Sequence, residues 1–231
     1  MKILLIAGLW LDGSVWGDVV AALEALGHHP VALSLPGQGD GATSSTLDDQ
    51  LSAVIAAVDA APGRALVVGH SAASTLAWMA VDARPEKVAK VVFIGGFPSS
   101  DGQLYADFFE PTGGVMAFPG WKAFEGPDSA DLGAEARRRF EAGALPVPEG
   151  VTKATVRLSD ERRFDVPVVV VCPEFTPAAA LGWIEAGGIP ELARAKQVGF
   201  VDIDSGHWPM ITKPAELAGI LAATATDAPS R

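Results

Sequence analysis

The chain has 231 residues, of which 49% are hydrophobic and 19% are charged, so it can bury a large core and is not globally disordered. Its formal net charge of −11 would repel a phosphate backbone, which argues against a nucleic-acid partner. The single cysteine, Cys172, excludes an intramolecular disulfide and a cysteine-rich metal site. The four histidines have no metal-binding spacing, so we expect no metal.

A membrane-spanning segment is not expected either. The longest stretch without a charged side chain, Ala65–Val81, is shorter than the about 20 apolar residues that a spanning helix needs, and it contains His70. Lys2 and the apolar run Ile3–Leu11 resemble the start of a signal peptide, but no small-residue cleavage motif follows them. We therefore expect a buried first strand in a cytoplasmic protein without a membrane partner.

The first part of the chain alternates apolar runs with helical patterns. Continuous apolar runs are typical of strands covered on both faces, and apolar residues at helical spacing follow three of them. The expected strands are Lys2–Ile6, Pro30–Leu35, Ala65–Val68 and Val88–Ile94. The expected helices run from a Ser14 cap to Gly27, from a Thr46 capping box to about Ala60, and from about Ala72 to Val81.

The alternation stops between Ser99 and Asp165. This stretch holds eight of the 17 aromatic residues, so it is not a solvated linker, and a structureless loop of this length is unusual in a compact domain. We predict a small, mostly helical lid over residues 99–165, with aromatic side chains that line a pocket. An inserted packing element without substrate contact is the alternative. The core then comprises residues 1–98 and 166–231.

Regular patterns resume after this stretch. Strands are expected at Val166–Cys172 and Phe200–Ile203, helices at Ala178–Ala186, Pro190–Lys196 and Pro214–Ala223, and a frayed tail from Thr224 to Arg231. Strands that alternate with helices predict an α/β fold with a doubly wound, mostly parallel sheet. Ligands of such sheets bind beyond the carboxyl ends of the strands.

The sharpest chemical signal is Gly69-His70-Ser71-Ala72-Ala73, at the junction of the third strand and the third helix. A serine at such a tight turn needs small residues two positions away on either side, and Gly69 and Ala73 are both small. The turn would expose the hydroxyl at a helix N-terminus, where peptide dipoles favour negative charge. The segment resembles the G-x-S-x-G nucleophile elbow of the alpha/beta-hydrolase superfamily, with Ala73 in place of the last glycine.

The order of the remaining motifs is also similar to this superfamily over nearly the whole chain. Gly206-His207-Trp208-Pro209 follows the last strand, where the superfamily has its catalytic histidine. The resemblance implies that Ser71 is the nucleophile and His207 the base. It also implies an oxyanion hole from the backbone N–H groups of Leu9 and Ala72. Many relatives have His-Gly where this chain has Ala7-Gly8, which leaves the backbone donor in place but changes how that loop is held.

The third member of a catalytic triad is less defined by the sequence. The superfamily places an acid after the strand that precedes the last one, and Glu174 is the carboxylate in that loop. Asp101, after the fourth strand, is the alternative acid, and a Ser71–His207 dyad without an acid is a further alternative. Asp204 is close to His207 in sequence but is constrained by the end of a strand.

The resemblance implies a carboxylesterase-like serine hydrolase that cleaves a small apolar or aromatic ester, or a lactone, through an acyl-enzyme and without a cofactor. Two kinds of alternative stay open: a non-hydrolytic member of the same fold, such as a hydroxynitrile lyase or a cofactor-free haloperoxidase, and a ligand-binding protein that has lost catalysis. A structural partner subunit would leave the serine and histidine motifs unexplained. The sequence indicates neither the natural substrate nor the oligomeric state.

Overall fold

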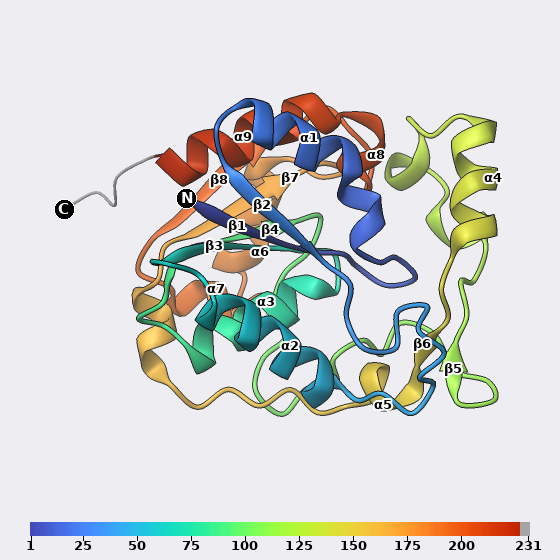
Figure 1. Ribbon diagram of the computed structural model, residues 1–231, viewed down its shortest axis with the longest axis horizontal. Coiled ribbons are helices and arrows are strands. Elements are labelled where there is room, and N and C mark those ends of the chain that lie inside the picture. The colour runs from blue at the N-terminus through green and yellow to red at the C-terminus, as the bar shows by residue number, and fades with distance from the viewer. Residues whose placement is uncertain (227–231) are drawn as a thin grey trace.

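A six-stranded sheet in the order β2-β1-β3-β4-β7-β8 forms the centre of the fold, and each neighbouring pair of its strands is parallel (Figure 1). The computed structural model describes residues 1–226. The strands are β1 (Lys2–Ile6), β2 (His29–Leu33), β3 (Ala65–His70), β4 (Val88–Ile94), β7 (Val168–Cys172) and β8 (Val198–Asp202). The predicted doubly wound α/β fold is therefore confirmed.

Helices cover both faces of this sheet. Figure 1 shows α1 and α9 on one face and α2 and α3 on the other. Successive side chains of a strand point to opposite faces, so Leu4 and Ile6 join the core under α2 and α3, while Ile3 and Leu5 join the core under α1 and α9. The helices are α1 (Gly17–Ala25), α2 (Leu47–Asp59), α3 (Ala73–Ala83), α6 (Pro177–Glu185), α7 (Pro190–Arg194), α8 (Pro209–Thr212) and α9 (Pro214–Thr226).

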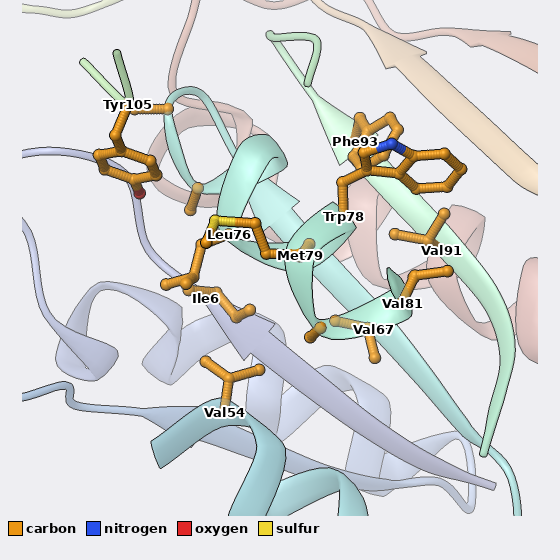
Figure 2. Packing of buried hydrophobic residues seen from close by; sticks show 14 of the residues in the cluster. Ile6, Val54, Val67, Leu76, Trp78, Met79, Val81, Val91, Phe93 and Tyr105 are labelled. Atoms are coloured by element: carbon orange, nitrogen blue, oxygen red, sulfur yellow. The ribbon is translucent and has the colours of Figure 1, made fainter. Parts of the chain in front are cut away.

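The larger of the two cores centres on α3. Figure 2 shows side chains of this helix packed among residues of β1, β3, β4 and α2, with Tyr105 at the edge of the same cluster. The α3 residues Leu76, Trp78 and Val81 are completely buried. Burial on all sides explains why apolar side chains occur all around α3 rather than along one stripe; its polar residues Ser74, Thr75 and Asp82 are buried as well.

The bounds of several elements differ by one or two residues from the sequence-based expectation, and two helix ends differ in kind. Asp12, not Ser14, caps the first helical segment: its carboxylate accepts hydrogen bonds from the backbone N–H of Ser14 at 2.9 Å and from its hydroxyl at 2.5 Å. An ionised acceptor binds a helix-terminal N–H more strongly than a hydroxyl does, and the chain enters α1 through the helical turn η1 (Gly13–Trp16). At the other end, Thr224–Thr226 belong to α9, and residues 227–231 of the expected tail lie outside the described part.

The connecting segment (residues 99–165) joins β4 to β7, and its elements α4, β5 and β6 lie on the side toward which β1 runs (Figure 1). Its aromatic side chains Phe118, Phe124 and Phe140 pack together and against the rings of Trp10 and Trp208. Its elements are β5 (Val115–Met116), η2 (Trp121–Phe124), η3 (Pro127–Ser129), α4 (Ala134–Gly143), β6 (Val147–Pro148), α5 (Glu149–Thr152) and η4 (Glu161–Asp165), and β5 pairs with β6 antiparallel. No helix within residues 1–226 has the length and apolar character to cross a membrane.

The close junction of β3 and α3 depends on Gly69. A Cβ at this position would collide with the carbonyl group of Ala73, which is backbone and cannot swing aside. We therefore expect Gly69→Ala to lower the free energy of unfolding by about 1–3 kcal/mol, the usual cost of overpacking. Urea denaturation measures this change.

Gly219→Ala is the matched control for that substitution. Gly219 lies within α9, and nothing lies within 4 Å of the place where its Cβ would be. Alanine should raise the free energy of unfolding there by about 0.5–1 kcal/mol, because it restricts the unfolded chain. If both substitutions changed the free energy of unfolding in the same direction, the result would contradict the conclusion that the junction of β3 and α3 requires a glycine at position 69.

Candidate active site

Ser71 occupies a strained turn between β3 and α3. Its φ is +55°, in the left-handed region that residues with a Cβ adopt at a cost of about 1–3 kcal/mol. Its backbone N–H donates to the carbonyl of Ile94 at 2.8 Å, and its own carbonyl accepts from the N–H of Ser74 at 2.9 Å. A Cβ on Gly96 would be 2.6 Å from the Ser71 carbonyl oxygen, so Gly96 leaves the room that this turn needs.

A chain of hydrogen bonds joins Ser71, His207 and Glu174. Ser71 Oγ lies 2.9 Å from His207 Nε2, and His207 Nδ1 lies 2.7 Å from Glu174 Oε1. The side chains of His207 and Glu174 are only 14% and 13% exposed. A carboxylate at Nδ1 holds the proton of a neutral imidazole there, so Nε2 is left to accept the hydrogen bond of the serine hydroxyl.

The three side chains come from loops at one edge of the sheet. Ser71 follows β3, Glu174 follows β7 and His207 follows β8, and the carboxyl ends of parallel strands meet at the same edge. The structure thus brings together three residues that the sequence singled out. It places the other two acidic residues differently. The exposed Asp101 accepts a hydrogen bond from Leu158 N at 2.8 Å, and within residues 1–226 neither Asp101 nor Asp204 is hydrogen-bonded to His207.

Leu9 and Ala72, whose backbone N–H groups are the predicted oxyanion donors, come from two different parts of the chain. Leu9 is in the loop after β1, and Ala72 is the residue from which α3 begins. Both residues line the same cavity as Ser71, and within the described chain neither N–H donates to a protein acceptor. A free N–H at the N-terminus of α3, together with one from the loop after β1, can stabilise an oxygen that gains negative charge.

His70, next to the serine, is a buried residue whose role the motif did not reveal. Its Nε2 lies 2.7 Å from the backbone carbonyl of His207, while its Nδ1 is buried without a partner among the described residues. Burial, and next the positive charge of His207, lower the pKa of His70 to about 3. His70 is therefore neutral at neutral pH, and its Nε2–H donates to the loop that carries His207.

Two aspartates of the connecting segment also hold the His207 loop, and no sequence signal pointed to them. The N–H of His207 donates to the Asp128 carbonyl at 2.7 Å, and the N–H of Gly206 donates to Asp131 Oδ2 at 2.8 Å. Burial, and then the nearby charge of Glu174, raise the pKa of the Asp128 carboxyl. The negative charge of Glu174 thus affects the pKa of a carboxyl in the connecting segment.

A cavity of about 490 Å³ lies above Ser71. The connecting segment contributes four of its aromatic walls, and the loops after β1, β4 and β8 contribute Trp10, Phe97 and Trp208. Among the described residues that line the cavity there is no Asp, Glu, Lys or Arg, so it suits a neutral ligand. The four walls are Tyr105, Phe108, Phe109 and Phe124.

Cys172, the other residue with a nucleophilic side chain near this edge, ends β7 and is completely buried. Burial, followed by the charges of Asp202 and Glu174, raises the pKa of its thiol to about 12, so it carries no thiolate at neutral pH. Within residues 1–226, no three His, Cys, Asp or Glu side chains are grouped as metal ligands. Ser71, unlike Cys172, lines the cavity.

Known sequences similar to this chain are esterases and hydrolases. The sequence profile of the Alpha/beta hydrolase family matches residues 3–220. Methylesterase 7 of Arabidopsis thaliana is 26% identical over an alignment of 252 residues, which covers 95% of this chain and 94% of that protein. Two chloroplastic proteins of the same plant, with provisional methylesterase names, are 31% and 32% identical over 114 residues; this match covers 47% of this chain and only 33% of theirs.

Solved structures share the fold at low sequence identity. An extracellular alpha/beta-hydrolase from a Paenibacillus species, which shares structural and functional homology with tobacco salicylic acid binding protein 2, superposes with a TM-score of 0.81 at 18% identity and covers 98% of this chain and 100% of that chain. Tomato methylketone synthase I in complex with 2-tridecanone has a TM-score of 0.74 at 19% identity, and a pyrethroid hydrolase from Sphingobium faniae has 0.71 at 20%; each covers 97% of both chains.

The buried, neutral state of His70 predicts a loss of stability in acid. The pKa of His70 falls from 6.5 in the unfolded chain to about 3 in the folded protein, so the unfolded chain binds more protons between these values. The contribution of neutral His70 to the free energy of unfolding is complete above pH 6.5, and below this pH it declines by about 1.4 kcal/mol per pH unit. Between pH 7 and pH 5, we expect wild-type protein to lose about 2 kcal/mol more than His70→Gln does.

Urea denaturation of both proteins at the two pH values measures this difference. Glutamine cannot titrate, yet its amide can still donate to the His207 carbonyl, and the other titrating groups cancel in the comparison. Parallel stability curves for the two proteins would contradict the assignment of a neutral His70.

Proposed function

The chain belongs to the alpha/beta hydrolase family, and we propose that it is a carboxylesterase-like serine hydrolase that acts through Ser71, His207 and Glu174. The observation that carries this proposal is the hydrogen-bonded chain from Ser71 Oγ through His207 to Glu174 at the base of an apolar cavity. A strained serine backbone at a helix N-terminus supports it further, because backbone strain concentrates at functional sites.

The first chemical step forms an acyl-enzyme. Ser71 Oγ attacks the carbonyl carbon of the substrate, and its proton passes to Nε2 of His207. The Glu174 carboxylate stabilises the imidazolium that forms, and the N–H groups of Leu9 and Ala72 bind the oxyanion. His207 then gives its proton to the leaving oxygen, so that an alcohol departs and the acyl group stays on Ser71.

The second step repeats this proton transfer with water. Nε2 of His207 takes a proton from a water molecule, whose oxygen attacks the acyl carbon through a second oxyanion. Collapse of this intermediate breaks the bond to Ser71, and His207 returns the proton to Oγ. A carboxylic acid is released, and no step requires a cofactor.

We further propose a small, neutral, apolar or aromatic ester, or a lactone, as the substrate. The aromatic cavity supports this choice, as does the similarity to a plant methylesterase over 95% of the chain. In this proposal the connecting segment is a lid, since Tyr105, Phe108, Phe109 and Phe124 of this segment wall the cavity. A non-hydrolytic enzyme or a ligand-binding protein of the same fold would release no acid from such esters.

Ser71→Ala tests the nucleophile. Without the hydroxyl, covalent labelling by a fluorophosphonate should disappear, and hydrolysis of p-nitrophenyl acetate should fall by at least about 10⁴-fold. His207→Ala should cost nearly as much, because these residues act as a unit. Circular dichroism checks that both variants are folded. Full activity in folded Ser71→Ala would refute the proposed nucleophile.

Glu174→Gln tests the acid. Glutamine can donate a hydrogen bond to Nδ1 and so favour the wrong tautomer, and it cannot stabilise the imidazolium. We expect kcat to fall by about 10³–10⁴-fold, with KM little changed. Asp101→Asn is the control, since Asp101 contacts Leu158 instead, and its kcat should stay at the wild-type value. The reverse pattern would transfer the role to Asp101.

A further inference from the structure

The connecting segment contacts both the loop that carries His207 and the loop that carries Leu9 (the oxyanion loop). We infer that it acts as a two-point clamp that fixes the His207 loop and the oxyanion loop in their reactive geometry, with Asp131 and Trp10 as positioning residues. This inference rests on the proposed serine hydrolase function. It differs from a hinged cover, which would touch the catalytic loops only when closed.

The first contact holds the loop before and at His207. Asp131 Oδ2 accepts from Gly206 N at 2.8 Å and from Ser205 Oγ at 3.0 Å, and the Asp128 carbonyl accepts from His207 N at 2.7 Å. A Cβ on Gly206 would collide with Asp128 and Asp131, so the two segments meet without room for a side chain. The orientation of the imidazole therefore follows the position of the connecting segment.

The Asp128–Asp131 turn is itself anchored within the connecting segment. Ser129 Oγ donates to the Phe124 carbonyl at 2.6 Å. The Arg137 guanidinium donates to the Ser129 carbonyl at 2.5 Å and to the Leu132 carbonyl at 3.0 Å. These bonds make the turn a firm support for the His207 loop rather than a loose surface loop.

The second contact holds the loop that carries Leu9. Trp10 has a φ of +64°, a conformation that persists only where the surroundings impose it. Trp10 Nε1 donates to the Met116 carbonyl at 3.2 Å, and the Trp10 carbonyl accepts from Leu145 N at 2.8 Å. Both partners belong to the connecting segment. Ala7, the residue before Gly8, has no polar side chain that could fix the oxyanion loop. The contacts of Trp10 with the connecting segment fix this loop instead.

One ring joins the two contacts. Phe124 of the connecting segment lies 5.8 Å from the Trp10 ring and 5.3 Å from the Trp208 ring, measured between centroids. Trp208 follows His207 directly, so a shift of the connecting segment would move both loops together. Misplacement of a catalytic group by about 1 Å can cost 10²-fold in rate. Loosening either contact should therefore lower kcat.

The His207 contact is tested with Asp131→Ala and Asp131→Asn. Alanine removes the acceptor for Gly206 N–H, whereas the asparagine oxygen can still accept it. We expect Asp131→Ala to lower kcat for p-nitrophenyl acetate about tenfold with KM within twofold, because Asp131 does not line the cavity. Asp131→Asn should restore kcat. Asp204→Ala is the control: this exposed aspartate is in the same loop and has no side-chain hydrogen bond within residues 1–226.

The oxyanion contact is tested with Trp10→Phe, which removes the Nε1–H donor but keeps a ring. We expect a decrease in kcat of about tenfold. Trp121→Phe is the matched control, because Trp121 Nε1 is buried without a partner among the described residues. It should retain the wild-type kcat. Every kcat is calculated per site titrated with a fluorophosphonate, so that unfolded protein does not contribute.

The outcomes separate this inference from the proposed function. If the wild-type protein neither reacts with the fluorophosphonate nor hydrolyses the ester, the proposed function fails, and the clamp fails with it. If the wild type is active, but Asp131→Ala and Trp10→Phe have wild-type kcat per titrated site, the clamp alone is refuted. An equal loss of kcat in Asp131→Asn or in the two controls would also refute it, because a general disturbance would then explain the effect.

Discussion

The left-handed backbone of Ser71 is the constraint on which the site depends. With φ of Ser71 at +55°, the chain passes from β3 into α3 through only Ser71 and Ala72, which places Oγ above the sheet edge and the α3 N-terminus behind it. That turn exists only because Gly69 and Gly96 have no side chains where Ala73 and Ser71 approach them. Parallel strands then bring the loops after β7 and β8 to the same edge, so that Glu174 and His207 can reach the serine.

His70 and His207 lie next to each other in space but differ in burial, and this difference gives them different roles. His70 is completely enclosed, which keeps it neutral and makes it a fixed donor to the His207 backbone. His207 keeps 14% of its side chain exposed and has the Glu174 carboxylate at Nδ1, so a positive charge on its ring is stabilised where it would form. Among the described residues, no Asp, Glu, Lys or Arg side chain lines the cavity above this pair, so no other charge there competes with these interactions.

The sequence predicts those parts of the site that are local or follow from strand order. The serine turn could be identified because its strand, its small neighbours and its helix are adjacent in the chain. Strand order places both Glu174 and Asp101 after strands of the sheet that also carries His207, and the structure distinguishes them, because only Glu174 of the two is hydrogen-bonded to His207 among the described residues. The contacts of Trp10 and Asp131 could not be predicted: they join residues 106 and 75 positions apart, and no periodic pattern or motif marks them. The Asp12 cap could not be predicted because two polar residues only two positions apart, Asp12 and Ser14, can each cap the same helix end.

Under the proposed function, the connecting segment unites substrate selection with catalytic geometry. Trp10 and Ser71 each hold a strained φ, which costs about 1–3 kcal/mol and must be offset by the packing around it. For Trp10 that packing consists of Phe109, Phe118 and Phe124, and two of these rings, Phe109 and Phe124, also wall the cavity. A smaller side chain at either position would therefore enlarge the cavity and, at the same time, release the loop that carries the Leu9 N–H. Because the same rings perform both tasks, a wider cavity in this fold comes with a less rigid oxyanion loop, and the range of substrates is limited by the rigidity that catalysis needs.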